Sequence, residues 1–451
     1  MPSALDQVFK AYDVRGVYPD QLDEELAEGV GRAFVALTGA STLAIGQDMR
    51  PSSKPMADAL AAGAMAQGAD VLRVGLCSTD MLYYVSGALD VAGVMLTASH
   101  NPARYNGLKL CRPGAVPVGE ESGLADIKRM VAAGEPATPS AHRGREQQAD
   151  DLLERYAAHV QGFADRDALR PLKVVADAGN GMAGHVVPAV FAGLPFELVS
   201  MFFELDGSFP NHPADPLNPE NLRELQARVV AEGADVGLAF DGDADRVFLV
   251  DELGATVPSS LVGALVARLM CEREPGATVL YNLICSRVVP ETIREAGGVP
   301  VRTRVGHSFI KGVMAETGAI FGCEHSGHYY FRDNYRADSG LIAALVTLDA
   351  LSRAGRPLSE VLAPYRRYAA SGEINRRVDD PGKVIETVAA CYPAEMADFA
   401  DGLTVEAGDW WFNLRPSNTE PLLRLNVEAT TVAEMARVRD EVLEAVGGEP
   451  A

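Results

Sequence analysis

A strand–helix–strand pattern recurs along the chain and restricts it to folds built on parallel sheets. The clearest copy spans residues 42–99, where short apolar runs alternate with an alanine- and methionine-rich helical stretch. Weaker copies open with Leu172–Gly184 and Ala277–Val289. Two parallel strands need a crossover of this kind, and the crossover is right-handed in nearly all proteins. We therefore predict three similar α/β domains in series.

The last part of the chain has a different pattern. Its apolar runs are separated by tight polar turns and followed by a helical stretch at Thr431–Val446, which predicts a small α+β domain. Polar segments rich in Pro, Gly, Ser or Asp separate the four parts, as linkers do. The predicted domains span residues 1–145, 146–253, 254–368 and 369–451.

Charge and composition exclude several classes of partner. The formal net charge is −22 and the pI is near 4.8, which argues against nucleic acid or an anionic membrane surface as a partner. No apolar run reaches the ~18 residues of a membrane span, and the first residues do not read as a signal peptide. The six cysteines form no C-x-x-C pair and read as reduced thiols. We expect a cytoplasmic protein that is a monomer.

The segment Leu238–Asp251 carries an acidic turn between two apolar runs. Asp241, Asp243 and Asp245 recur at every second position, so their carboxylates point the same way in an extended or tightly turned chain. Such carboxylates repel unless a hard cation such as Mg²⁺ or Ca²⁺ sits among them. Arg246 adds a fixed positive charge, and a metal beside a guanidinium suits phosphoryl transfer. A helix–loop–helix Ca²⁺ site fits poorly, because Arg246 stands where its glycine is needed; a solvated turn without metal remains open.

A Thr-Ala-Ser-His-Asn-Pro hexapeptide begins at the end of the predicted strand Val91–Ser99. Ser99 therefore lies at the carboxyl end of a parallel strand, where ligands of such sheets bind. It is a candidate nucleophile or phosphate carrier with His100 as its base, although neighbours in a strand point apart. Lys109, on the predicted return strand, can bring an ammonium group close. A capping serine in a tight turn is the alternative.

Two further loops carry candidate ligands. The sequence Gly-Cys-Glu-His-Ser-Gly-His places Glu324 and Ser326 where they can hold sugar hydroxyls, and a zinc site there lacks a fourth ligand at normal spacing. Upstream, His307 puts an imidazole at the end of a predicted strand. The run Arg-Pro-Ser-Asn-Thr-Glu-Pro suits phosphate capture, with a plain hairpin loop as the alternative; its candidates are Arg415, Ser417, Asn418 and Thr419. Near the N-terminus, Tyr12 and Arg15 can face one pocket.

These four motifs together resemble the α-D-phosphohexomutase family. TASHNP, DGDADR, EHSGH and RPSNTEP occur in the order and at the spacing of that family, over nearly the whole chain. Within it the chain is similar to the bacterial phosphomannomutase/phosphoglucomutase group. The resemblance implies an α/β fold of three similar α/β domains with mixed sheets plus a C-terminal α+β domain, arranged around a central active-site cleft.

The resemblance also implies roles for individual residues. Ser99 matches the phosphoserine that donates and recovers the phosphoryl group, and its phosphate completes a Mg²⁺ site with the three aspartates. Arg246, His100 and Lys109 match groups beside the transferred phosphate. Glu324 and Ser326 match residues that hold sugar hydroxyls. The Arg415 loop matches the grip on the other phosphate, and Tyr12 and Arg15 match a substrate-facing segment.

The implied activity is the interconversion of mannose 6-phosphate and mannose 1-phosphate, with glucose phosphates as further substrates. The implied cofactors are Mg²⁺ and a glucose 1,6-bisphosphate or mannose 1,6-bisphosphate activator. A phosphoglucosamine mutase and a non-catalytic sugar-phosphate-binding protein are the alternatives. One departure concerns the acid/base: Ile284 stands where family members often have lysine, which leaves His307 and Lys109 as candidates. Cys323 stands where glycine is common.

Overall fold

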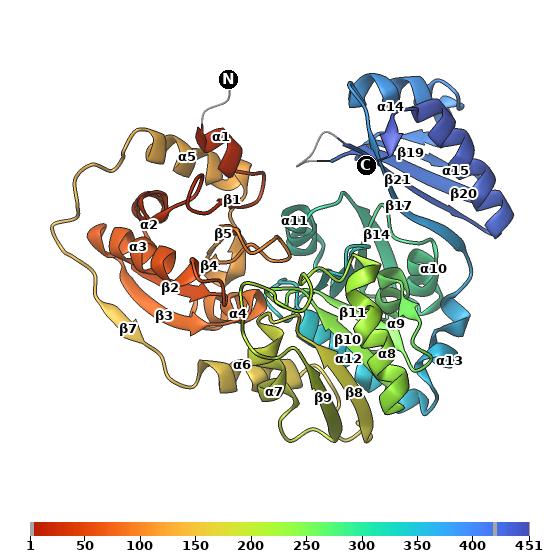
Figure 1. The fold of residues 1–451 in the computed structure, drawn as a ribbon, viewed down its shortest axis with the longest axis horizontal. Coiled ribbons are helices and arrows are strands. Elements are labelled where there is room, and N and C mark those ends of the chain that lie inside the picture. Colours follow the sequence, from red (N-terminus) through yellow and green to blue (C-terminus); the bar gives the residue numbers. More distant parts are fainter. Residues whose placement is uncertain (1–3, 418–421, 451) are drawn as a thin grey trace.

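The chain folds into four sheet-based units. The computed structural model describes residues 4–417 and 422–450, apart from the side chain of His307. The first three units contain mixed sheets with helices, and the fourth is an antiparallel sheet with helices, which confirms the predicted α/β class. Figure 1 shows the fourth unit, in blue, standing apart from the first unit, in red and orange, with the other two below and between them.

The first unit contains the largest of the four described sheets. Its strands lie in the order β1 (Val14–Val17), β5 (Tyr105–Arg112), β4 (Ala92–Leu96), β2 (Thr42–Gln47), β3 (Asp70–Leu76) and β7 (Glu146–Gln148), with β6 (Val116–Pro117) on β5. Strands β4, β2, β3 and β7 are parallel, whereas β5 is antiparallel to both of its neighbours in this order, β4 and β1. Its helices are α1 (Ala4–Val8), α2 (Glu24–Thr38), α3 (Ser53–Ala66), α4 (Thr79–Leu89) and α5 (Leu124–Ala132). The parallel part is the predicted strand–helix–strand–helix–strand pattern.

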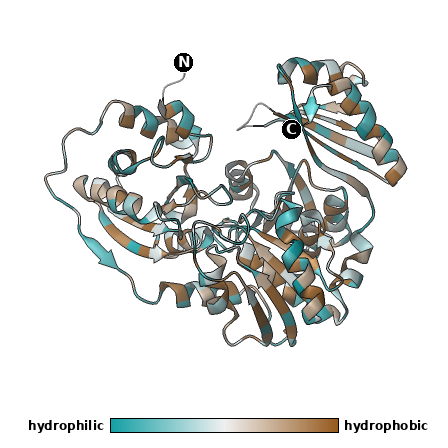
Figure 2. Cartoon of the chain, in the orientation of Figure 1, coloured by the Kyte–Doolittle hydropathy of each residue, from teal (hydrophilic) through white to brown (hydrophobic). Residues whose placement is uncertain are grey.

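Two details differ from the predicted element bounds. The strand predicted to reach Ser99 ends at Leu96, so the hexapeptide forms a loop. The polar linker predicted between the first two units contains β7, which pairs with β3 and forms the edge of the sheet. Figure 2 shows β7 in hydrophilic colours, in contrast to the hydrophobic inner strands. Because all three residues of β7 are exposed polar side chains, hydrophobic periodicity could not reveal this strand.

The second and third units repeat the pattern in shorter form. The second sheet has the order β12 (Thr256–Val257), β11 (Val247–Asp251), β10 (Val236–Phe240), β8 (Leu172–Asp177) and β9 (Phe196–Met201), with helices α6 (Leu152–Gln161), α7 (Ala183–Phe191) and α8 (Arg223–Glu232). The third has the order β14 (Val299–Thr303), β13 (Thr278–Asn282), β15 (Phe321–Cys323) and β16 (Tyr329–Phe331), with helices α9 (Ser259–Arg273), α10 (Val288–Glu295), α11 (His307–Thr317), α12 (Gly340–Ala354) and α13 (Leu358–Leu362). In the second sheet β11 is antiparallel to both β10 and β12, and in the third sheet β16 is antiparallel to β15; the other pairs of these two sheets are parallel.

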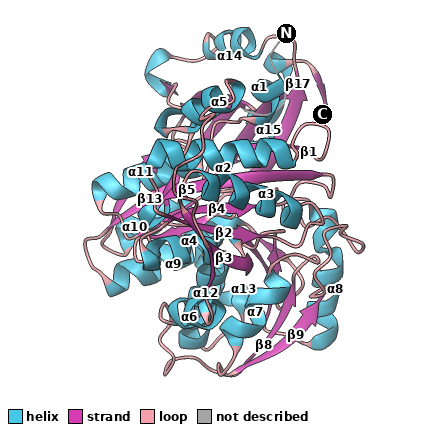
Figure 3. Ribbon diagram, turned by 90° about the vertical axis from the view of Figure 1, so that its left-hand side faces the viewer, coloured by secondary structure: helices cyan, strands magenta, loops and turns pink. Residues whose placement is uncertain are grey.

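The fourth unit is an antiparallel sheet with two helices. Its strands lie in the order β18 (Ala397–Asp398), β19 (Leu403–Glu406), β20 (Trp410–Pro416), β21 (Leu422–Ala429), β17 (Ala369–Arg377) and β22 (Glu449–Pro450), with helices α14 (Pro381–Ala389) and α15 (Val432–Val446). Figure 3 shows the long strand β17 at the top of the molecule, close to the C-terminus. The fourth unit has its own core, separate from the core of the second and third units.

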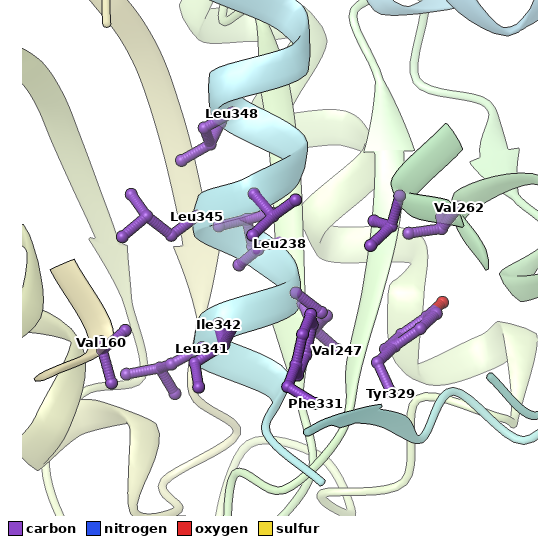
Figure 4. Close-up of a cluster of buried hydrophobic side chains, with 14 of the residues drawn as sticks. Val160, Leu238, Val247, Val262, Tyr329, Phe331, Leu341, Ile342, Leu345 and Leu348 are labelled. Atoms are coloured by element: carbon purple, nitrogen blue, oxygen red, sulfur yellow. The ribbon is translucent and has the colours of Figure 1, made fainter. Parts of the chain in front are cut away.

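Helix α12 ties the second and third units together. Its residues Gly340–Ser352 are buried without exception, as expected for a helix that is apolar over most of its surface. Figure 4 shows Leu341, Leu345 and Leu348 of this helix beside residues of β10, β11 and β16. One hydrophobic cluster joins these side chains to Leu82 and Val85 of α4 in the first unit. The first three units therefore share a common core, which fixes the loops between them. Among the described helices, none is long and apolar enough to cross a membrane.

Candidate active site

The serine loop follows β4 at the carboxyl end of the parallel strands. Ser99 has a left-handed backbone conformation with φ 49°, which is uncommon for a residue other than glycine. Its N–H donates to Thr97 Oγ1 at 2.9 Å. Ser99 Oγ lies 3.3 Å from His100 Nδ1, because these residues are outside the strand and its alternation of side chains no longer applies. The two side chains therefore meet, unlike neighbours in a strand.

The acidic loop connects β10 to β11, and the antiparallel ladder of these strands holds its two ends together. Asp241, Asp243 and Asp245 are buried, and one carboxylate oxygen from each lies within 4.8 Å of the others. Thr79, the first residue of α4, donates its hydroxyl to Asp243 Oδ2 at 2.6 Å and its N–H to the Asp243 carbonyl at 3.1 Å. The first unit thus orients a carboxylate that belongs to the second.

The serine and acidic loops touch directly. Ser99 Oγ donates to Asp241 Oδ2 at 2.8 Å, and Arg246 Nε donates to the same oxygen at 2.9 Å. Arg246 Nη2 lies 2.6 Å from His100 Nδ1 and 3.5 Å from Ser99 Oγ. A Cβ on Gly242 would lie only 2.4 Å from the Ser99 carbonyl oxygen, so only glycine permits this approach. A hydroxyl, an imidazole, a guanidinium and a carboxylate therefore meet at one point.

Lys109 supplies a second cation to the acidic loop. Its Nζ lies 2.8 Å from Asp243 Oδ2 and 2.7 Å from Asp245 Oδ2. Burial lowers the pKa of Lys109, but the two carboxylates outweigh it and raise the pKa well above its ordinary value. Lys109 is therefore a fixed cation and a poor proton acceptor. Burial and then Arg246 lower the pKa of His100 well below its ordinary value, so this imidazole is neutral at pH 7.

The acidic cluster fits a divalent cation. The formal charges of three carboxylates, Arg246 and Lys109 sum to one negative charge, from three negative and two positive groups. Asp243 Oδ1 and Asp245 Oδ1 are buried and accept no hydrogen bond. Buried acceptors without a donor are unfavourable unless an ion or a water serves them. The all-oxygen donor set is the one that Mg²⁺ and Ca²⁺ prefer.

The loop between β15 and β16 lies beside the acidic loop. Glu324 is buried and accepts from Tyr330 Oη at 2.8 Å, Gly306 N at 3.1 Å and Asn282 Nδ2 at 3.2 Å. Ser326 Oγ lies 3.0 Å from His328 Nδ1. The backbones of His328 and Arg246 form an isolated β-bridge, and His328 Nε2 lies 3.8 Å from Asp245 Oδ1. The second and third units therefore contribute adjacent parts of one site.

Arg415 lies near the end of β20 in the fourth unit. It faces Arg424 of β21 in the antiparallel register, and Glu373 lies between their guanidinium groups, 2.9 Å from Arg415 Nη2 and 3.2 Å from Arg424 Nη1. Arg424 Nη2 also donates to Ser417 Oγ at 3.3 Å. Two guanidinium groups against one carboxylate leave a net positive charge. Asn418 and Thr419 lie outside the described residues.

The remaining predicted residues lie at the edges of this arrangement. Arg15 Nη1 donates to Asn101 Oδ1 in the serine loop at 2.7 Å. The ring of Tyr12 meets the ring of Phe309 edge to face with centroids 6.1 Å apart, beside the first turn of α11. The backbone of His307 begins α11, and its side chain is outside the described part.

Ile284, which stands where family members often have lysine, supplies no charged group to the site. It is buried with Leu283 and Trp411, where the third unit meets the fourth. A cavity of about 320 Å³ lies next to this contact, lined by Ile284, Trp411, His325 and Glu428 among others. Neither Ser99 nor Asp241 is among the residues that line this cavity.

Four residues of the site were not predicted from the sequence. They are Arg50, Thr79, His328 and Arg424. His328 belongs to a motif that was recognised, but it was considered only as a zinc ligand. Arg424 could have been found by pairing the two strands that flank the Arg415 loop. Arg50, which donates to the Ser99 carbonyl, and Thr79, which donates to Asp243, act through contacts with residues distant in sequence, for which no local pattern exists.

The four domains of one known family match nearly the whole chain. Domains described as phosphoglucomutase/phosphomannomutase, alpha/beta/alpha domains I, II and III, match residues 6–137, 154–254 and 258–368. The C-terminal domain of the same description matches residues 373–445.

Individual relatives agree with these matches. Proteins of Xanthomonas campestris named phosphohexose mutases and of Escherichia coli K12 named phosphomannomutase are 41% and 39% identical to the chain, and each alignment covers 96% of this chain and 97% of the relative. A crystal structure of a phosphoglucomutase/phosphomannomutase family protein from Burkholderia thailandensis superimposes with a TM-score of 0.89 at 34% identity, over 100% of both chains.

Proposed function

The chain belongs to the phosphoglucomutase/phosphomannomutase family, and we propose that it interconverts mannose 6-phosphate and mannose 1-phosphate and also accepts glucose phosphates. The observation that carries the proposal is the contact of Ser99 Oγ with Asp241 inside a buried, three-carboxylate cluster bordered by Arg246. A serine there, once phosphorylated, has its phosphate between a cation-binding cluster and a guanidinium. The names of full-length relatives support mannose phosphate as the main substrate.

The reaction consists of two transfers. In the first, a hydroxyl oxygen of the sugar monophosphate forms a bond to the phosphorus on Ser99, the bond from phosphorus to Ser99 Oγ breaks, and the hydroxyl proton passes to a base. The product is a hexose 1,6-bisphosphate. After it turns round, its other phosphoryl group returns to Ser99 Oγ, and the proton returns to the sugar oxygen that is released. Such transfers depend on positioning and charge neutralisation more than on covalent assistance.

We assign the proton transfer to His328 in preference to Lys109. Lys109 is held by two ion pairs, and its raised pKa keeps it protonated. His328 lies between Glu324 and Asp245, with ring nitrogens 3.6 Å and 3.8 Å from their carboxylates, so it is next to both the sugar loop and the acidic loop. An imidazole can accept a proton at one ring nitrogen and donate one from the other. His307 remains a second candidate from the sequence.

We propose that Asp241, Asp243, Asp245 and the phosphate on Ser99 hold Mg²⁺. The buried oxygens of Asp243 and Asp245 that accept no hydrogen bond support this assignment. When bound, Mg²⁺ would neutralise charge on the oxygens of the transferring phosphoryl group. Arg246 and His100 border the same oxygens, and a 1,6-bisphosphate of glucose or mannose would act as the activator that phosphorylates Ser99.

The other predicted residues hold the substrate in this proposal. Glu324 and Ser326 bind sugar hydroxyls, which mannose and glucose phosphates share. Arg415, with the loop Ser417, Asn418 and Thr419, binds the phosphate that is not transferred, and the net positive charge around Arg415 supports that role. Tyr12 and Arg15 border the substrate from the N-terminal side.

A coupled mutase assay tests the function. The purified protein is given mannose 1-phosphate or glucose 1-phosphate with Mg²⁺ and a trace of glucose 1,6-bisphosphate. We expect activity that requires the bisphosphate, that is lost in Ser99→Ala, and that is retained in Ser140→Ala, which changes an exposed serine. Activity confined to glucosamine phosphate would point to a phosphoglucosamine mutase. Phosphate release without isomerisation, or binding without turnover, would also contradict the proposal.

A further inference from the structure

A buried guanidinium lies beneath the serine loop and has no role in the reaction described above. Arg50 follows β2 at the carboxyl end of the first sheet, and only 2% of its surface is exposed. Burying an arginine is unfavourable unless every part of its head group is paired. The partners of Arg50 therefore indicate what this residue does.

Arg50 binds the backbone of the serine loop at four carbonyl oxygens. Nη2 donates to Ser99 O at 2.9 Å and to Asn101 O at 2.7 Å. Nη1 donates to Pro102 O and to Tyr105 O, both at 2.9 Å. The planar fork of a guanidinium can serve several acceptors in one plane, whereas an ammonium on a flexible stem cannot reproduce this geometry. One side chain thus holds the loop from Ser99 to the start of β5.

The guanidinium is itself held from two sides. Asp48 Oδ2 accepts from Arg50 Nε at 3.1 Å, and Asp48 Oδ1 accepts from the Arg50 backbone N–H at 3.0 Å. The ring of Phe209, from the second unit, has its centroid 5.1 Å from Arg50 Cζ, a cation–π contact. Arg50 is therefore fixed in position before any ligand binds.

The serine loop needs such support because its geometry is demanding. Ser99 has φ 49°, and its carbonyl lies against Gly242 of the acidic loop, which leaves no room for a side chain. Strained backbone of this kind persists only where the surroundings hold it. The carbonyl that Arg50 binds is the carbonyl that contacts the acidic loop. A shift of this carbonyl would also move Ser99 Oγ relative to Asp241.

We propose that Arg50, fixed by Asp48, is a positioning residue for phosphoryl transfer at Ser99: it holds the loop backbone so that the serine oxygen faces the acidic cluster and Arg246. The inference rests on the proposed function. Arg50 touches no reacting atom, so its loss should affect the transfer step and leave binding of the sugar phosphate, through Glu324 and Arg415, largely unchanged.

The test compares Arg50→Lys with Arg73→Lys. Arg73 lies on β3 in the same unit and also donates to a backbone carbonyl, that of Ala57, at 3.2 Å, but none of the contacts described for it is with a residue of the serine loop. For Arg50→Lys we expect kcat to fall about 100-fold, the size of effect that a misplacement of ~1 Å produces, while KM changes less than about 3-fold. Phosphorylation of Ser99 by glucose 1,6-bisphosphate, followed by intact mass, should slow in parallel. Arg73→Lys should retain both rates.

Several outcomes would overturn the inference. These are a kcat of Arg50→Lys close to the wild-type value, a change confined to KM, or an equal loss in Arg73→Lys. If Arg50→Lys does not fold, Asp48→Asn takes its place, and the same split between kcat and KM is expected with a smaller loss; unchanged kcat there also overturns the inference. Wild-type protein without mutase activity would refute the proposed function instead, so the two failures are distinguishable.

Discussion

Replacing Lys109 by methionine removes a charge from the acidic cluster with little change in side-chain length. Lys109 pairs with Asp243 and Asp245 at 2.8 Å and 2.7 Å, and these carboxylates are buried. In Lys109→Met the three aspartates face Arg246 alone, so the net charge of the cluster falls from −1 to −2. Without Mg²⁺ no cation replaces the ammonium.

The expected destabilisation follows from this burial. Removing one partner of a buried ion pair costs about 3–5 kcal/mol, because the other partner stays buried without compensation. For the three units that share a core, with an unfolding entropy of ~2.1 cal/mol/K per residue, that loss corresponds to a fall in the unfolding midpoint of about 4–6 °C. Mg²⁺ should reduce the difference in unfolding midpoint between the variant and the wild-type protein, because the variant lacks the ammonium that competes with the ion for the same carboxylates. Binding at ~100 times Kd contributes about 2.7 kcal/mol.

Thermal unfolding followed by circular dichroism, in EDTA and in saturating Mg²⁺, measures both effects. Lys173→Met is the matched control, because Lys173 also pairs with two carboxylates, those of Glu197 and Glu232, but at the surface. We expect the unfolding midpoint of this control to stay close to that of the wild-type protein, both in EDTA and in Mg²⁺. The reasoning is refuted if Lys109→Met unfolds at the wild-type temperature in EDTA, or if Mg²⁺ stabilises both proteins equally.

Two further predictions concern other parts of the chain. Burial raises the pKa of Asp80 to about 6 even though three hydroxyls hydrogen-bond to it. This folded-state pKa lies above the value of ~3.9 in the unfolded chain. Asp80 therefore contributes up to about 3 kcal/mol to the free energy of unfolding, a contribution that is present below pH 4 and lost as pH rises through 6. Urea unfolding at pH 4 and pH 7 should show no such loss of stability in Asp80→Asn. A variant with the pH dependence of the wild-type protein would contradict the assignment of this loss to Asp80. Arg424→Met should raise KM for sugar phosphates about 10-fold, the effect of ~1.4 kcal/mol of lost binding, and change kcat less; an unaltered KM in the mutase assay would exclude Arg424 from phosphate binding.

The fold could be predicted from the sequence because its signals are local. Buried parallel strands are continuous apolar runs, and the helices between them begin at recognisable caps such as Ser78, which accepts from Met81 N. The same logic placed Ser99 after a parallel strand, at the edge of the sheet where ligands bind, and Asp241 in a turn between two apolar runs. It could not predict that the two loops touch, because that contact depends on how the first and second units pack. The shared core around α12 decides this packing, and its members come from three units.

The unpredicted residues of the site differ in whether the sequence could have revealed them. Arg424 pairs with Arg415 across the hairpin of β20 and β21, so the residue is recoverable once the two strands are aligned. Arg50 is not recoverable in this way, because its partners on the serine loop are carbonyl oxygens, which almost any residue presents equally well. A side chain that recognises backbone leaves no complementary residue type in the sequence. Residues that position a catalytic loop through its backbone therefore become visible only in three dimensions, even when the loop itself can be predicted from its motif.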